Sequence, residues 1–314
     1  MQRPETAVVA LGGNALSPPG VRSTIADQFR HTRESLGPIV DLAVEGHNLC
    51  IVHGNGPQVG DELIRNEIAS AEVAALPLGV LVANTAGWIG YMIQQSVENA
   101  LRRAGSDRRV ATVITQVEVD PADTALGEPT KFIGHAIPPD RGQRLASEGL
   151  YVKKDARGHV RRVVGSPTPL AIHEIDVIRH LVKQGTIVIA CGGGGIPVYR
   201  DPGLGLEGID AVIDKDLAAA VLARELGARL LLILTDVDGV YAEWGTPAQR
   251  RLARLSTAEA ARLDAAGAFG EGSMAPKVRA ALDYVNRTGG RAVITELSRG
   301  IDAVHGRTGT TIAR

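Results

Sequence analysis

The sequence contains only two cysteines, few aromatic residues, no excess of charge of either sign and no long apolar run. Cys50 and Cys191 have neither CxxC nor histidine spacing, which favours two buried, reduced thiols over a disulfide or a metal site. Aromatic residues make up 3% of the chain, against 37 glycines. This composition disfavours a β-sandwich and suits aliphatic strands joined by glycine-rich turns, so we expect an α/β fold.

The charges are almost balanced, with 34 basic and 35 acidic residues in 314. Such a chain has no general attraction for nucleic acid or for an anionic membrane, so neither is an expected partner and any basic site must be local. No apolar run approaches the roughly 20 residues of a membrane-spanning helix. The N-terminal segment MQRPETAVVALGG lacks the apolar core of a signal peptide. Together with the thiols, this predicts a cytoplasmic protein.

Short apolar runs alternate with helix-like segments along most of the chain, as in a doubly wound α/β fold with parallel strands. Strands are predicted at 7–11, 49–53, 111–117, 187–191, 230–234 and 291–295, with a closing segment at 310–312. Helices are predicted at 26–45, 61–69, 84–103, 176–184, 215–226, 257–266 and 276–288. The chain has room for one large domain or for two lobes.

The alternation breaks down between residues 120 and 169. This stretch is rich in proline, and two alternating runs, 151–155 and 159–163, flank Ala156-Arg157-Gly158 as the strands of a β-hairpin would. We therefore expect an inserted flap or small subdomain. Lys153 and Lys154 in the hairpin are interpreted as solvated surface lysines.

Glycine-rich loops follow four of the predicted strands, namely Gly12-Gly13-Asn14, Gly54-Asn55-Gly56, Gly192 to Gly195, and Asp236 to Gly239. Glycine lets backbone N–H groups approach an anion, although a glycine at a strand end is more often only a turn. Four such loops at one edge of a parallel sheet favour a phosphate site. The pattern GxxxxGK[ST] is absent, and the one GxGxxG match, at 203–208, follows no strand, which disfavours a dinucleotide dehydrogenase.

Lysine is scarce in this arginine-rich sequence, and three lysines adjoin turn or helix-start residues: Pro129-Thr130-Lys131, Asp214-Lys215-Asp216 and Met274-Ala275-Pro276-Lys277. Any one of them is more often a solvated surface lysine than a functional one. Phosphoryl transfer, however, needs positive charge where the phosphate oxygens pass. The apolar run 230–234 leads from the Lys215 helix to the turn residues 235–239, so a cation and a loop are predicted to face one crevice.

A set of motifs in this order resembles carbamate kinase, in the amino acid kinase superfamily. The motifs are Ala10-Leu11-Gly12-Gly13-Asn14-Ala15-Leu16, His53 to Gln58, Ile89 to Gln95, Pro129 to Lys131, Arg161 to Val164, Cys191 to Val198, Asp210 to Asp216 and Gly272 to Lys277. The resemblance spans almost the whole chain. It implies an open αβα sandwich around a central, mostly parallel sheet, a homodimer, and reversible phosphoryl transfer between ATP and carbamate, which gives carbamoyl phosphate and ADP.

The same resemblance implies roles for individual residues. Catalysis would fall to Lys131, Lys215, Lys277 and Asp216; the carbamate and phosphate groups would lie against Gly12, Gly13, Asn14, Gly54, Asn55, Gly193 and Gly194; the nucleotide would lie against Thr235, Asp236, Val237, Tyr241, Met274 and Lys277. Mg²⁺ would arrive with the nucleotide rather than on protein ligands. Residues 1–314 would form a single domain of two lobes. A lobe of about 1–210, carrying the flap at about 120–170, would take carbamate and the transferring phosphate and would form the dimer contact, and a lobe of about 211–314 would take the nucleotide.

Some positions depart from the family pattern. Residues 84–87 read Asn-Thr-Ala-Gly where a Met and a Gln are usual, and the flap lacks a usual Pro after Lys131 and a usual Trp and Pro at 159–160 and 165. His135 and His173 are the nearest candidates for a new acid–base role, although a lone histidine is more often structural. The departures keep two alternatives open: a related kinase with another small carboxylate or phosphate acceptor, and a catalytically weak nucleotide-binding sensor.

Overall fold

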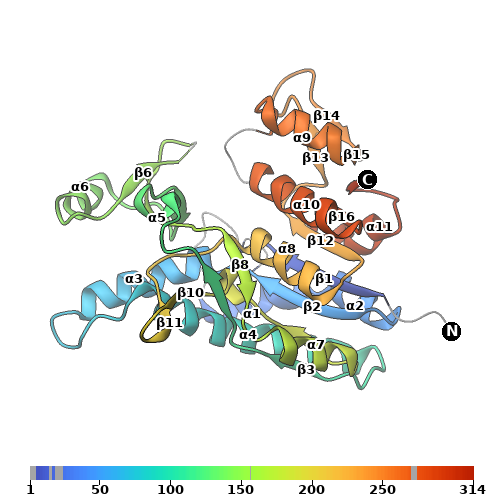
Figure 1. Cartoon of the computed structure of the whole chain (residues 1–314), viewed down its shortest axis with the longest axis horizontal. Coiled ribbons are helices and arrows are strands. Elements are labelled where there is room, and N and C mark those ends of the chain that lie inside the picture. The colour runs from blue at the N-terminus through green and yellow to red at the C-terminus, as the bar shows by residue number, and fades with distance from the viewer. Residues whose placement is uncertain (1–4, 14–15, 18–23, 156, 270–273) are drawn as a thin grey trace.

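The computed structural model of the chain describes residues 5–13, 16–17, 24–155, 157–269 and 274–314 (Figure 1). Within these residues an eight-stranded sheet has the order β15-β17-β16-β12-β1-β2-β9-β3. Its strands are β1 (Thr6–Leu11), β2 (Asn48–His53), β3 (Val110–Thr112), β9 (Ile187–Ile189), β12 (Leu230–Thr235), β15 (Arg254–Ser256), β16 (Arg291–Glu296) and β17 (Thr310–Ala313). Only β16 and β17 pair antiparallel, so the predicted mostly parallel sheet is confirmed.

Helices cover both faces of this sheet. Successive side chains of a strand point to opposite faces, and a strand buried on both faces is therefore apolar throughout. Val8 and Ala10 of β1 belong to the core that includes α7 (Ile175–Lys183), α8 (Lys215–Leu226), α9 (Thr257–Ala265) and α10 (Met274–Thr288). Val9 and Leu11 belong to the core that includes α1 (Ile25–Glu34), α2 (Gly37–Val44), α4 (Leu78–Arg103) and α11 (Gly300–Val304). The expected αβα sandwich is confirmed.

Three smaller sheets carry the remaining strands. A four-stranded sheet has the order β11-β10-β4-β8, from β4 (Gln116–Val119), β8 (Pro169–Ile172), β10 (Ile196–Asp201) and β11 (Gly205–Gly208). A hairpin is formed by β13 (Val240–Ala242) and β14 (Arg250–Leu252). The other connecting elements are α3 (Gly56–Ala69), the 3₁₀ turn η2 (Gly192–Gly194) and the 3₁₀ turn η3 (Leu297–Arg299).

The flap projects from the main body, at the upper left of Figure 1. It contains α5 (Thr124–Gly127), β5 (Lys131–Ile133), α6 (Pro139–Ser147), β6 (Val152–Lys154) and β7 (Val160–Val164). The three strands form an antiparallel sheet in the order β5-β7-β6. The predicted hairpin around residue 156 is therefore confirmed as β6 and β7, and both hairpin lysines, Lys153 and Lys154, are exposed.

The single helix predicted at 26–45 is wrong, because the chain forms two helices there. The first helix, α1, ends at Glu34, and α2 begins at Gly37 with Pro38 in its first turn. Proline has no N–H to bond to a carbonyl one turn back, and its ring clashes with the preceding turn. Pro38 is tolerated at the start of α2 for the same reason that it ends a continuous helix.

The single strand predicted at 111–117 is also wrong. The chain leaves the main sheet after Thr112 and enters the four-stranded sheet at Gln116. Thr115 bends the intervening backbone: its Oγ1 donates to Val113 O at 2.8 Å and accepts from Cys191 N at 3.0 Å. Such local side-chain bonds offer the backbone an alternative to a strand ladder, and an apolar pattern alone does not reveal them.

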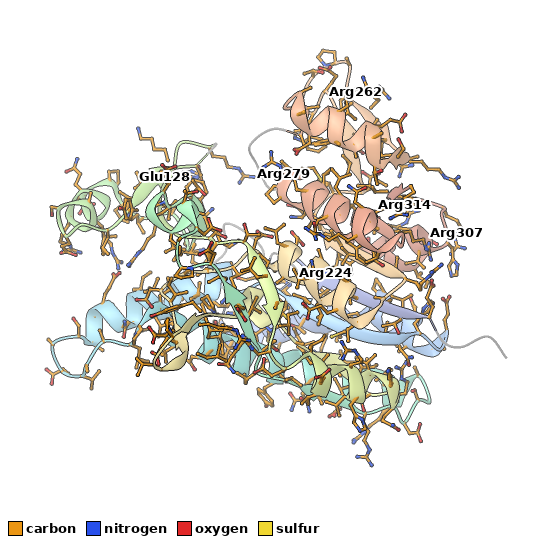
Figure 2. The ribbon with its side chains drawn as sticks, viewed as in Figure 1. Glu128, Arg224, Arg262, Arg279, Arg307 and Arg314 are labelled. Atoms are coloured by element: carbon orange, nitrogen blue, oxygen red, sulfur yellow. The ribbon has the colours of Figure 1, made fainter. Side chains whose placement is uncertain are left out.

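Both thiols, Cys50 and Cys191, are free and fully buried, as predicted. Burial raises the pKa of each thiol above its ordinary value. Arg224 and Arg279 lie on α8 and α10, the neighbouring helices that pack on the same face of the main sheet (Figure 2). No helix of the described residues is both long enough and apolar enough to cross a membrane.

Candidate active site

The carboxyl ends of four parallel strands, β1, β2, β9 and β12, meet at one edge of the main sheet. The loop after β1 is tied to both neighbours, since Gly12 N donates to Leu234 O and Gly54 N donates to Leu11 O, each at 3.2 Å. The ends of neighbouring strands in an open parallel sheet are where ligands bind. The four glycine-rich loops singled out in the sequence follow these four strands.

Glycine is required here by close approach of the loops. A Cβ on Gly54 would lie 3.2 Å from Cδ of Lys215 and 3.3 Å from Gly13 N. A Cβ on Gly193 would lie 2.4 Å from Nδ2 of Asn55, and Gly193 has a φ of +70°, which side chains rarely adopt. The structure therefore brings Gly13, Gly54, Asn55, Gly193 and Lys215 together. Asn14, another predicted site residue, lies outside the described residues.

The start of α8 supplies the charged centre of this site. Asp214 caps the helix, its side chain accepting from the backbone N–H groups of Asp216 and Leu217. Lys215 is the first residue of the helix, and its Nζ lies 2.6 Å from Oδ1 of Asp216. Lys277, from the first turn of α10, places its Nζ 3.4 Å from Oδ2 of the same carboxylate. One buried carboxylate thus holds two lysines side by side.

Lys215 is almost completely removed from solvent. Burial lowers the pKa of its ammonium group, and the nearby Lys277 lowers it further, while the carboxylates of Asp216 and Asp214 oppose both effects. Burial and like charge both disfavour a second cation. A site that holds two ammonium groups around one carboxylate is therefore suited to an anion, because an anion offsets the excess positive charge.

The third lysine reaches this centre from the flap. Lys131, the first residue of β5, places its Nζ 2.9 Å from Oδ2 of Asp214. Burial by itself would raise the pKa of Asp214, but the charges of Lys131 and Lys215 hold that pKa well below its usual range. The cap of α8 is thus a charged carboxylate that links the flap to the main body.

Four of the predicted nucleotide residues lie in or next to the loop after β12, namely Thr235, Asp236, Val237 and Tyr241. Oγ1 of Thr235 donates to Asp236 at 3.1 Å, and the hydroxyl of Tyr241 donates to Oδ1 of Asp238 at 2.5 Å. This hydrogen bond, together with burial, raises the pKa of Tyr241. Met274 begins α10, which also carries Lys277. Val237 lies in the same loop.

Sequence reasoning missed Trp244, whose ring packs edge-on against Tyr241 with centroids 5.1 Å apart and which is 60% exposed. The signal in the sequence was a tryptophan three residues after Tyr241, in a chain with only two tryptophans. His135 and His173 lie against other carboxylates, Asp61 at 3.7 Å and Glu118 at 3.1 Å. Among the contacts recorded for the described residues, neither histidine touches the three lysines.

A model of the amino acid kinase family matches residues 5–296. The chain belongs to the amino acid kinase family. Carbamate kinase of Halobacterium salinarum is 46% identical over 310 residues, covering 97% of this chain and 97% of its own. Carbamate kinase of Pyrococcus horikoshii is 42% identical over 312 residues, covering 98% and 99%. These full-length matches confirm the resemblance drawn from the motifs.

Solved structures agree with the sequence comparison. The structure of a carbamate kinase from Giardia lamblia bound to AMP-PNP superposes on this member of the amino acid kinase family with a TM-score of 0.91. The two chains are 37% identical, and the match covers 100% of this chain and 99% of the other. The match therefore includes the flap and the two helices, α8 and α10, that carry Lys215 and Lys277.

Proposed function

We propose that this amino acid kinase is a carbamate kinase, which transfers a phosphoryl group reversibly between ATP and carbamate. The observation that carries the proposal is the lysine centre: Lys215 and Lys277 share Asp216, and Lys131 reaches Asp214 from the flap. Positive groups fixed before the reaction stabilise the charge that spreads over the transferring phosphoryl oxygens. The full-length relatives named carbamate kinase support the choice of acceptor.

In the forward reaction, a carbamate oxygen attacks the γ-phosphorus of ATP in line with the bond to the β-phosphate. The new O–P bond forms as that bond breaks, and ADP leaves with the electron pair, so no covalent enzyme intermediate is needed. Lys215 and Lys277 are proposed to bind the transferring oxygens, while Asp216 holds both ammonium groups in place. Lys131 is proposed to approach the same group from the flap side.

The remaining predicted residues divide between the two substrates. We assign carbamate and the transferring phosphate to Gly12, Gly13, Gly54, Asn55, Gly193 and Gly194, whose loops lie in the part of the chain before residue 211. We assign the nucleotide to Thr235, Asp236, Val237, Tyr241 and Met274, in the part that follows. The protein would thus act as two lobes of one domain with the flap above the lysine centre.

Magnesium is expected to accompany the nucleotide. The carboxylate at the centre of the site, Asp216, is already held by two lysines, which suits phosphate oxygens and not a bare cation. Among the described residues, no group of three His, Cys, Asp or Glu side chains is placed to hold a metal. We propose that Mg²⁺ arrives on the nucleotide phosphates, where it would neutralise charge.

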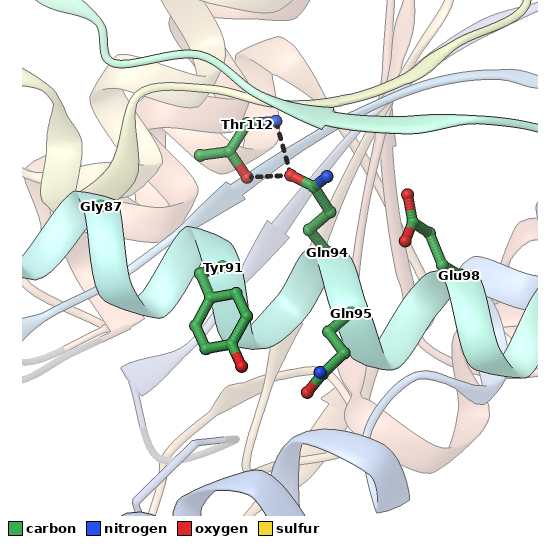
Figure 3. Close-up of a pocket in the computed structure, with 6 residues that line it drawn as sticks. All are labelled: Gly87, Tyr91, Gln94, Gln95, Glu98 and Thr112. Atoms are coloured by element: carbon green, nitrogen blue, oxygen red, sulfur yellow. Dashed lines mark hydrogen bonds between the residues drawn. The ribbon is translucent and has the colours of Figure 1, made fainter.

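A second proposal concerns assembly. The outer face of α4 has a hollow of about 300 Å³ lined by Gly87, Tyr91, Gln94, Gln95, Glu98 and Thr112 (Figure 3). Gln94 is fixed there by hydrogen bonds from the N–H and hydroxyl of Thr112, at 3.1 and 3.0 Å. Tyr91 is 55% exposed, and Ile25 and Ile114 are also exposed large apolar side chains. We propose that this face forms the homodimer contact, which light scattering of the intact protein would measure.

We also propose that the enzyme works in the cytoplasm, and the two buried, free thiols support this location. A role in arginine metabolism is proposed as well and would be consistent with it.

The decisive experiment is ATP formation from carbamoyl phosphate and Mg-ADP by the purified protein, a direction that avoids unstable carbamate. Turnover that requires both substrates is the expected result. Lys215→Ala should abolish it with the fold retained, whereas Lys183→Ala, in the last turn of α7, is a matched control that should not. No ATP from wild-type protein that still binds Mg-ADP would refute the proposed acceptor and redirect the search to other small acids and phosphates.

A further inference from the structure

Asn55 and Thr85 share a buried hydrogen bond next to the acceptor end of the site. Asn55 follows Gly54 in the loop after β2 and is only 2% exposed. Its Nδ2 donates to Oγ1 of Thr85 at 2.9 Å. Thr85 lies in α4, thirty residues further along the chain, and is fully buried. The loop after β2 is here called the acceptor loop, because we assign it to the phosphoryl acceptor, carbamate. The bond therefore joins the acceptor loop to α4, a helix that has no other assigned part in the reaction.

The helix determines which way the amide of Asn55 faces. Oγ1 of Thr85 lies 3.0 Å from Leu81 O and 2.9 Å from Val82 O, both carbonyls of α4. A carbonyl only accepts, and a hydroxyl has one proton to donate, so that proton is directed into the helix. Oγ1 is then left to accept a bond, and the donor that it receives is the NH₂ end of the Asn55 amide. Oδ1 consequently faces away from Thr85.

Gly193 confines the same amide from the other side. A Cβ at this position would lie 2.4 Å from Nδ2 and 2.6 Å from Cγ of Asn55. The backbone of η2 therefore packs directly on the amide and fixes its plane. The O and NH₂ ends have nearly the same shape, so packing alone does not decide which end faces Thr85. No described residue donates a hydrogen bond to Oδ1 of Asn55. Oδ1 is thus an acceptor without a described donor that is not itself fully buried, beside Gly54, and Gly54 in turn adjoins Gly13 and Lys215.

Carbamate and carbamoyl phosphate differ from acetate and acetyl phosphate by carrying a planar NH₂ group in place of a methyl group. The NH₂ group donates hydrogen bonds and the methyl group does not. We propose that Thr85 is a positioning residue that holds Oδ1 of Asn55 toward the substrate NH₂ group, and thereby sets the preference for carbamoyl over acetyl phosphate. This inference rests on the proposed function, because it concerns the acceptor of that reaction.

The expected effect follows from the cost of an unpaired buried group. Acetyl phosphate would cover Oδ1 without supplying a donor, and an acceptor orphaned in this way corresponds to a discrimination of roughly ten- to a hundredfold. Without the Thr85 hydroxyl, the amide of Asn55 loses the partner that fixes its orientation. Turning the amide would present Nδ2 to the substrate NH₂ group, so turnover of carbamoyl phosphate would fall while turnover of acetyl phosphate would change little.

The test compares kcat/KM for carbamoyl phosphate and for acetyl phosphate, each with saturating Mg-ADP. Thr85→Val keeps the shape but removes the hydroxyl, and we expect it to lower the carbamoyl-to-acetyl ratio about tenfold. Thr85→Ser keeps the hydroxyl and should retain the wild-type ratio. The KM for Mg-ADP should stay unchanged in both, which separates positioning from general damage. Thr85→Ala provides the same comparison if the valine variant does not fold.

Three outcomes would overturn the inference. Equal losses for both phosphates in Thr85→Val and Thr85→Ala would reduce Thr85 to a packing residue, and a wild-type ratio below one would show that no NH₂ recognition exists. Loss of selectivity in Thr85→Ser would show that the methyl group, and not the hydroxyl, is responsible. Wild-type protein that uses neither phosphate would refute the proposed function itself, a result distinct from the other three.

Discussion

Removing the charge of Asp216 is the sharpest test of how the site lysines are held. Asp216→Asn keeps the size of the side chain but leaves the ammonium groups of Lys215 and Lys277 without the carboxylate between them. Both lysine side chains are only about one-tenth exposed, at 11% and 10%. Breaking a buried ion pair by removing one partner costs about 3–5 kcal/mol.

The lower end of that range applies here. Each lysine keeps some contact with water, and Asp214 still lowers the potential near Lys215. A loss of about 3 kcal/mol in the free energy of unfolding corresponds to a fall of about 5 °C in Tm for a chain of this size. Turnover should fall as well, because the two ammonium groups would repel each other out of position.

An anion should reverse the effect on stability, since it supplies the negative charge that the variant lacks. The assay is thermal unfolding with and without millimolar sulfate, for the wild type, for Asp216→Asn and for Asp283→Asn as a control on α10. Asp283 is a more exposed carboxylate paired with Arg287. We expect sulfate to raise Tm more in Asp216→Asn than in the other two. A variant that melts at the wild-type temperature, or gains no more from sulfate, would refute the proposed charge balance.

Two further predictions concern the flap and pH. Lys131→Ala should lower kcat about a hundredfold or more while leaving the KM for Mg-ADP unchanged, since Lys131 reaches the site from the flap. Lys153→Ala, on the exposed hairpin, is the control. An unchanged kcat in Lys131→Ala would show that the flap lysine is not catalytic. Burial lowers the pKa of His53 from 6.5 to about 4. The unfolded chain therefore binds a proton between these values that the folded chain does not, so the stability held above pH 6.5 should fall by up to about 3 kcal/mol as the pH drops to 4. The free energy of unfolding, measured with urea at each pH, should change less with pH in His53→Gln than in the wild type. An equal dependence on pH in the two proteins would contradict a neutral, buried His53.

The sequence predicted the lysine centre better than it predicted its pairings. Scarce lysines beside turns, together with the family motifs, indicated Lys131, Lys215 and Lys277. The motifs also implied that Asp216 orients the lysines, but no local pattern could pair Lys131 with Asp214, because these residues are 83 positions apart and meet only through the docked flap. The structure pairs Asp216 with two of the lysines and gives the third to Asp214. Such pairings depend on tertiary contacts that spacing does not encode.

The sheet was predictable for a related reason, and its errors have local causes. Strands buried on both faces read as continuous apolar runs, which is why β1, β2 and β12 were found with small errors at their ends. The missed break at Pro38 and the missed departure from the sheet at Thr115 both depend on how the backbone satisfies its hydrogen bonds. The bond between Thr85 and Asn55 was hidden because the two residues are thirty positions apart in the chain and meet only in the fold.

The helix α3 contacts both the acceptor loop and the flap that carries Lys131. The helix begins at Gly56, next to Asn55, and Gly56 O accepts from Gly134 N of the flap at 2.8 Å. One turn later, a Cβ on Gly60 would lie 2.1 Å from Cα of Gly134, so the flap backbone rests directly on the helix.

At its far end, α3 carries Glu67, whose carboxylate binds two flap arginines, Arg141 at 2.8 Å and Arg162 through its other oxygen. One carboxylate that holds two arginines fixes the flap more firmly than an isolated surface pair, because both partners must leave together. The helix therefore connects the acceptor loop to the flap that carries Lys131. A shift of the flap must either break the contacts along α3 or move the start of α3 with it, so the position of Lys131 and the shape of the acceptor loop are expected to change together.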